Sequence, residues 1–106
     1  MREIGRLARA LVPSSALVKL AHPPFDVLVS LVDGAPCAIE DACNHAGASL
    51  AEGTREGDRV RCVMHGYVFS LVTGELEAPR GLCEGQRRFA ARFEGDDVVV
   101  YEPLGE

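Results

Sequence analysis

The chain has 106 residues, of which 47% are hydrophobic and 25% charged, the balance of a folded globular protein rather than a disordered one. No apolar run approaches the roughly 20 residues that cross a bilayer. The apolar pair Leu11-Val12 ends at Pro13, so a signal peptide is not expected either. The net charge of −5 argues against nucleic acid, because phosphates attract clusters of Lys and Arg. We therefore expect a cytoplasmic protein with no membrane or nucleic-acid partner.

Turn signals recur at short intervals, and the segments between them are rich in Val, Leu, Ile and Phe. Many short strands in an all-β domain produce this rhythm. Asp33-Gly34 and Gly95-Asp96 lie between apolar runs and predict two tight hairpin turns. Residues 1–12 also fit an amphipathic helix, because their apolar side chains recur at helical spacing. The expected strands are Ile4–Ala8, Ala16–Ala21, Phe25–Val32, Pro36–Glu40, Arg59–Val63, Tyr67–Ser70, Arg87–Phe93 and Val98–Glu102.

Two short segments each pair one cysteine with one histidine, and both fall at expected loops. They are Cys43-Asn44-His45 and Cys62-Val63-Met64-His65. A Rieske [2Fe–2S] centre needs two Cys on one iron and two His on the other. A mixed pair in each segment lets two facing loops each supply one ligand to each iron. Gly47 and Gly66 follow the histidines and allow the chain to turn tightly around the inorganic core. The pattern predicts a one-electron carrier whose cluster is held by these two Cys and two His.

The same four side chains could instead hold zinc in a tetrahedral site. Structural zinc sites usually pair like ligands, in Cys-x-x-Cys and His-x-x-x-His segments. Here each segment is mixed, and the second runs into strand-like sequence. We therefore favour an iron–sulfur cluster over zinc.

Other residues with chemical potential have simpler interpretations. Cys37 and Cys83 lie outside the ligand segments and are expected to be two buried thiols rather than a disulfide. His22 has no cysteine nearby, which is typical of an exposed turn residue. Phe69 is expected in the core. Acidic pairs such as Glu40-Asp41 either keep the protein in solution or steer a basic redox partner toward it.

The ligand segments and their surroundings resemble the Rieske ferredoxin family, in particular the small carriers that serve aromatic-ring-hydroxylating oxygenases. The matching residues are Cys43, His45, Gly47, Leu50, Gly53, Cys62, His65, Gly66, Phe69, Thr73, Gly74 and Pro79. The resemblance implies an all-β fold, a Rieske-type antiparallel β-sandwich with a small cluster-binding lobe. It implies one Rieske domain over residues 1–106, with cluster-binding loops at about 41–53 and 62–70.

The resemblance also implies the role of each ligand and the type of carrier. Cys43 and Cys62 would bind the buried iron, and His45 and His65 the outer iron near the surface. The chain would be a low-potential carrier with one [2Fe–2S] cluster, passing electrons from a flavoprotein reductase to a terminal oxygenase. Such a carrier is a component of a dioxygenase system, has no catalytic residue of its own, and is expected to be a monomer. Two alternatives stay open, a small Rieske subunit of a nitrite reductase complex and a structural zinc module.

Three positions differ from the Rieske proteins of cytochrome bc complexes. Those proteins carry two further cysteines where this chain has Ala48 and Met64, so their loop disulfide is absent here. They also carry a serine where this chain has Tyr67, which removes a hydroxyl donor to a cluster sulfide. Both differences argue against quinol oxidation and for a reduction potential at the lower end of the Rieske range.

Overall fold

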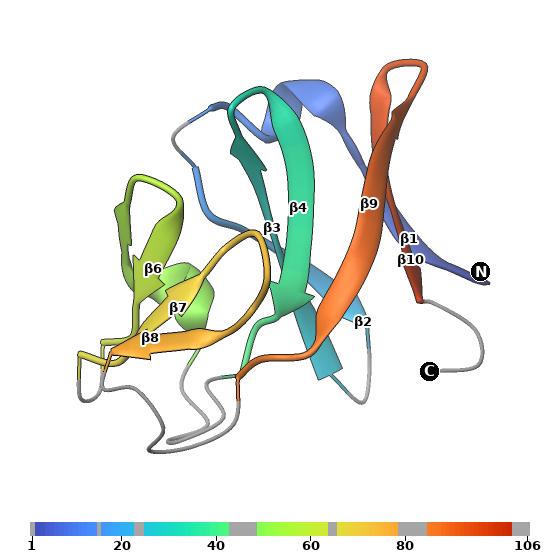
Figure 1. Ribbon diagram of the computed structural model, residues 1–106. Helices are drawn as coiled ribbons and strands as arrows, with labels where there is room; N and C mark the ends of the chain where they lie inside the picture. Colours follow the sequence, from blue (N-terminus) through green and yellow to red (C-terminus); the bar gives the residue numbers. More distant parts are fainter. Residues whose placement is uncertain are drawn as a thin grey trace.

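The computed structural model describes residues 2–14, 16–22, 25–42, 49–63, 66–78 and 85–102. These residues form two antiparallel sheets, a large one and a small one beside it (Figure 1). Two short 3-10 helices, η1 and η2, are the only helical elements in the described ranges. None of the helices described is long and apolar enough to cross a bilayer.

The large sheet has six strands in the order β1-β10-β9-β4-β3-β2, and the small sheet has four in the order β5-β6-β7-β8. The strands of the large sheet are β1 (Arg2–Ala8), β2 (Val18–His22), β3 (Phe25–Val32), β4 (Ala35–Glu40), β9 (Arg88–Glu94) and β10 (Asp97–Glu102). Those of the small sheet are β5 (Thr54–Glu56), β6 (Arg59–Arg61), β7 (Val68–Ser70) and β8 (Leu76–Ala78). The helices are η1 (Arg9–Leu11) and η2 (Leu50–Glu52). The predicted all-β class is therefore confirmed.

Both predicted hairpin turns are confirmed. Asp33 and Gly34 join β3 to β4 with φ angles of 53° and 80°. Two successive positive φ angles define the type I′ turn, whose twist matches that of the flanking strands. Gly95, with φ of 62°, begins the two-residue turn between β9 and β10.

The helix interpretation of residues 1–12 is wrong. Arg2–Ala8 forms strand β1, which pairs antiparallel with β10, and only Arg9–Leu11 makes a 3-10 turn. Pairing with β10 satisfies the backbone of this segment while Ile4 and Leu7 still pack against apolar neighbours. Tertiary pairing thus overrides a local period that fitted a helix.

The strand prediction also needs correction in the small sheet. The sequence pattern does not predict β5 or β8, because each has only three residues and no apolar alternation. The expected strands Arg59–Val63 and Tyr67–Ser70 are shorter than predicted, since Cys62 and Tyr67 belong to the turn between β6 and β7. In the large sheet, β2 begins at Val18 rather than at Ala16.

Strands β3 and β4 are buried on both faces and so connect two hydrophobic cores. The first core, between the sheets, consists of Leu28, Ile39, Leu50, Val60, Cys62, Phe69 and Leu71. The second core, within the large sheet, consists of Val12, Val27, Val29, Ala38, Phe89, Val98 and Val100. Successive residues of a strand point to opposite faces, so Leu28 joins the first core while Val27 and Val29 join the second. The predicted core position of Phe69 is confirmed, because its side chain is fully buried.

Candidate metal centre

Of the four predicted ligands, the structure describes only Cys62. Cys43, His45 and His65 lie outside the described residues, as do Cys83 and the proline loop that begins at Pro79. Within the described ranges, no group of three or more His, Cys, Asp or Glu side chains is placed to hold a metal ion. What the structure does give is the framework around both ligand segments.

Cys62 lies directly after β6 and is only 2% exposed, in the first core. Its backbone N–H donates to the Tyr67 carbonyl at 2.8 Å, and the Gly66 N–H donates to the Cys62 carbonyl at 3.1 Å. Gly66 has a φ of 72°, a conformation that glycine adopts without steric cost. The two ends of the segment that contains His65 are therefore joined by the main chain itself.

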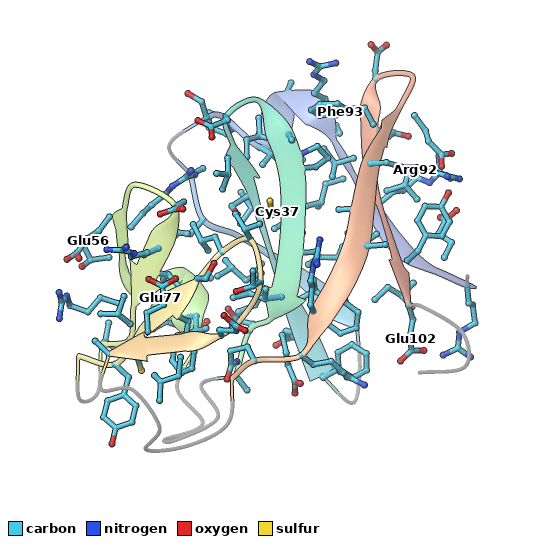
Figure 2. The ribbon with its side chains drawn as sticks, in the orientation of Figure 1. Cys37, Glu56, Glu77, Arg92, Phe93 and Glu102 are labelled. Carbon is cyan, nitrogen blue, oxygen red and sulfur yellow. The ribbon has the colours of Figure 1, made fainter. Side chains whose placement is uncertain are left out.

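Arg61 supports this turn from outside. Its Nη1 donates to the Gly66 carbonyl at 3.1 Å, and its Nε donates to the Glu56 carboxylate at 3.0 Å. The Arg61 guanidinium lowers the pKa of the Glu56 carboxyl through this hydrogen bond. Figure 2 shows Glu56 on the small sheet, at the end of β5. The guanidinium thus ties the residue that follows His65 to the neighbouring strand.

Asp41 holds both ends of the segment that contains Cys43 and His45. The backbone pairs Ala42 with Ser49 in an isolated bridge, and the Leu50 N–H donates to the Asp41 carbonyl at 2.9 Å. The Asp41 carboxylate accepts hydrogen bonds from Ser49 Oγ at 2.6 Å and from the Ala51 N–H at 2.8 Å. Backbone and side chain of one residue therefore close this segment.

The interpretation of Glu40-Asp41 as a surface acidic pair is wrong for Asp41. Its side chain is 3% exposed and lies 3.7 Å from Lys19 Nζ. Glu40 is itself paired with Arg87 at 3.5 Å. Glu77, labelled on β8 in Figure 2, is paired as well, because its carboxylate lies 2.6 Å from Arg59 Nε. Each of these carboxylates is therefore paired with a nearby cationic side chain, which reduces the negative field it can exert at long range.

The described residues after the first ligand segment and before the second approach each other closely at Gly53. A Cβ built on this glycine would lie 2.2 Å from the Arg61 carbonyl oxygen and 3.1 Å from that of Leu50. The turn that follows the first ligand segment therefore presses against the strand that leads into Cys62. Gly53 has φ of −82° and ψ of −165°, so the requirement for glycine is the close approach and not the dihedral angles.

Gln86 connects the segment before β9 to the end of β4. Its side-chain Nε2 donates to the Glu40 carbonyl at 2.7 Å and to the Ala42 carbonyl. Its backbone N–H donates to the Gly74 carbonyl at 2.6 Å, and Gly74 has a φ of 80°. Gln86 thereby contacts both sheets close to the residue that precedes Cys43.

Sequence reasoning missed Asp41, Arg61 and Gln86 as supports of the ligand segments. Nothing in the local pattern distinguishes Gln86, because its partners are distant in sequence.

Cys37 is a free and half-buried thiol on β4 (Figure 2), and burial raises the pKa of its thiol.

Comparisons with known proteins identify the family of this chain. The Rieske [2Fe-2S] domain family matches residues 13–83. The ferredoxin component of biphenyl 2,3-dioxygenase from Rhodococcus jostii (strain RHA1) is 37% identical over 84 residues, which are 79% of this chain and 78% of that protein.

Solved structures share the arrangement of the two sheets. The ferredoxin of carbazole 1,9a-dioxygenase from Nocardioides aromaticivorans IC177 has a TM-score of 0.85 at 18% identity, covering 97% of this chain and 100% of that one. At this identity the likeness shows the fold. A second similar structure is a chain in a complex of reduced oxygenase and oxidized ferredoxin in carbazole 1,9a-dioxygenase. It has a TM-score of 0.82 at 27% identity and covers 93% of this chain and 96% of that chain. The family match over residues 13–83 and the 37% identity to the Rhodococcus jostii protein show that the chain belongs to the Rieske [2Fe–2S] family of ferredoxins.

Proposed function

We propose that Cys43, His45, Cys62 and His65 hold the [2Fe–2S] cluster of this family, with two thiolates on one iron and two imidazoles on the other. The described part of the site supports the assignment. Cys62 is buried among apolar side chains, in a turn whose backbone hydrogen bonds already fix its position. Two thiolates and two imidazoles are also the ligand types that a Rieske cluster takes. The residues present therefore fit the group.

The chain is an electron-transfer protein and not an enzyme. When bound, the cluster accepts and releases one electron. The observation that carries this function is the 37% identity, over most of both chains, to a protein named as the ferredoxin component of a dioxygenase. Cys62 lies buried in the first core, so as a ligand it would hold the cluster where apolar side chains exclude water.

For the partners, we propose a flavoprotein reductase as electron donor and a terminal oxygenase as acceptor. The solved complex of a related ferredoxin with an oxygenase supports the second partner. We also propose that the carrier has a low reduction potential, is a monomer and is cytoplasmic. Voltammetry would test the potential, size-exclusion chromatography the oligomeric state, and cell fractionation the location. Residues 1–106 would form one Rieske domain, with cluster loops at about 41–53 and 62–70, because the first core is shared by both sheets.

The assignment is tested on protein purified without oxygen. We expect about two irons and two sulfides per chain, negligible zinc, and the g-values of mixed His/Cys ligation in the EPR spectrum of the reduced protein. His45→Ala should lose the cluster, whereas the matched variant His22→Ala should keep it, since His22 is the one histidine outside the ligand segments. A colourless zinc protein, or a His45→Ala variant with an unchanged spectrum, would contradict the ligand assignment.

The carrier role is tested separately by mixing the oxidised protein with NADH and the reductase of a biphenyl-type dioxygenase. Reduction on the timescale of turnover, followed by reoxidation when the oxygenase is added, is the expected result. A cluster-loaded protein that the reductase does not reduce would overturn this pairing and favour another partner, such as a nitrite reductase.

A further inference from the structure

Gln86 is a polar side chain in a buried position, where its amide serves the main chain of another strand. The residue is 7% exposed. Both of its amide hydrogens are directed at the end of β4, because Nε2 donates to the carbonyls of Glu40 and Ala42. Ala42 immediately precedes Cys43 in the sequence. The last described carbonyl before the first ligand segment is therefore held by a side chain from the segment before β9.

The backbone of Gln86 extends this link to the small sheet. Its N–H donates to the Gly74 carbonyl at 2.6 Å, and a Cβ built on Gly74 would lie 2.4 Å from the Gln86 carbonyl oxygen. Gly74 follows the turn after β7, and β7 follows the second ligand segment. Gln86 thus contacts the end of β4 and the turn after β7 at the same time, without being a ligand itself.

We propose that Gln86 is a positioning residue for the cluster, which fixes the backbone from which Cys43 begins. The inference rests on the proposed function, because it takes Cys43 as a ligand. Hydrogen bonds around a metal site orient its ligands, and their loss reduces metal affinity by about 10–100-fold in other proteins. Removing the amide would also leave two backbone carbonyls without the donor that now satisfies them.

Arg55 offers a matched control, because it makes the same kind of link at the other end of the sheets. Its guanidinium donates to the carbonyls of Leu31 at 2.5 Å and Ala16 at 3.3 Å. Leu31 lies next to the β3–β4 hairpin, whereas Glu40 is the last residue of β4, at the opposite end of the same strand pair. Arg55 therefore joins the sheets away from the ligand segments.

The experiment compares cluster-loaded Gln86→Met, Gln86→Asn and Arg55→Met with the unmodified protein. Methionine keeps the length of the side chain and removes the donors, while asparagine keeps the amide but is one methylene too short to reach both carbonyls. Three quantities are measured without oxygen: the urea midpoint of unfolding, the EPR spectrum of the reduced protein, and the rate at which a ferrous-iron chelator removes the cluster.

We expect all three variants to unfold at lower urea concentration. Only the Gln86 variants should also shift or broaden the EPR g-values and release iron faster, by about tenfold for Gln86→Met and less for Gln86→Asn. Arg55→Met should keep the original spectrum and release rate within about twofold below its unfolding midpoint. Gln86→Asn provides the test if Gln86→Met does not accumulate with its cluster.

Gln86 variants that keep the original spectrum and release iron no faster than Arg55→Met would overturn the proposal and make Gln86 a link between sheets only. Failure of the proposed function looks different, because the unmodified protein itself would then lack the mixed His/Cys spectrum.

Discussion

Replacing Gly53 by alanine tests whether the close packing of the two ligand segments matters for the cluster. The new Cβ would lie 2.2 Å from the Arg61 carbonyl oxygen, whereas real Cβ atoms essentially never come within 3.0 Å of another heavy atom. The neighbouring atom belongs to the backbone of β6, so it cannot rotate away as a side chain would. The turn after Ser49 and the strand before Cys62 must therefore move apart.

The size of the effect follows from two opposing terms. Overpacking in a closely packed region costs roughly 1–3 kcal/mol. Because the φ and ψ angles of Gly53 suit alanine, the substitution also stabilises by about 0.4–1 kcal/mol through the unfolded chain. At the midpoints of these ranges the net loss is about 1.3 kcal/mol, which lowers Tm by roughly 5–10 °C in a domain of this size.

Gly57→Ala is the control for a glycine substitution without this contact. Gly57 has a φ of 64°, and nothing lies within 4 Å of a Cβ built on it. Its replacement should cost about 1–2 kcal/mol through the left-handed backbone alone. Thermal unfolding gives the stability of both variants, and EPR of the reduced proteins gives the cluster environment.

We expect a similar loss of stability in both variants, but a changed spectrum and lower cluster content only in Gly53→Ala. If Gly53→Ala keeps the stability, iron content and spectrum of the unmodified protein, the contact with Arg61 does not position the ligand segments and the reasoning is refuted.

Three further predictions concern other parts of the molecule. Asp41→Ala should lower the free energy of unfolding by about 2–4 kcal/mol in urea titrations, because Ser49 and the Ala51 N–H lose a buried carboxylate acceptor. The control Asp26→Ala removes a 4.0 Å contact between Lys19 and an exposed carboxylate, so it should change the free energy of unfolding by less than about 0.5 kcal/mol. Equal losses of stability in the Asp41 and Asp26 variants would contradict the structural role of Asp41. The midpoint potential should fall at the lower end of the Rieske range of about −150 to +300 mV, and voltammetry giving a value well above zero would favour quinol oxidation instead. The Cys37 thiol should react with iodoacetamide more slowly than glutathione does at pH 8, because burial raises the pKa of Cys37 and favours the protonated thiol. Peptide mass spectrometry measures this rate, and a rate equal to that of glutathione would count against the burial of Cys37.

The donor set and the two hairpins depend on residue type and close spacing, and the sequence predicts both. Two Cys-His segments specify the ligand chemistry of a Rieske centre without reference to the rest of the fold. Asp33-Gly34 and Gly95 predict the hairpin turns because these residue types adopt positive φ angles at low cost. The family resemblance rested on the same local segments, and the comparisons confirm it.

The supports of the site could not be predicted in this way. Gln86 reaches a carbonyl 44 positions away at Ala42, and Gly53 is required because β6 passes beside it. Asp41 looks like a surface charge in the sequence, but its side chain is buried in the folded protein, where it contacts Lys19 on β2 and Ser49. The helical period of residues 1–12 was likewise overridden by pairing with β10. Ligand type is a property of single residues, so the sequence alone can predict it, whereas a hydrogen bond or a steric contact needs two distant segments in register. Only the tertiary structure brings those segments together.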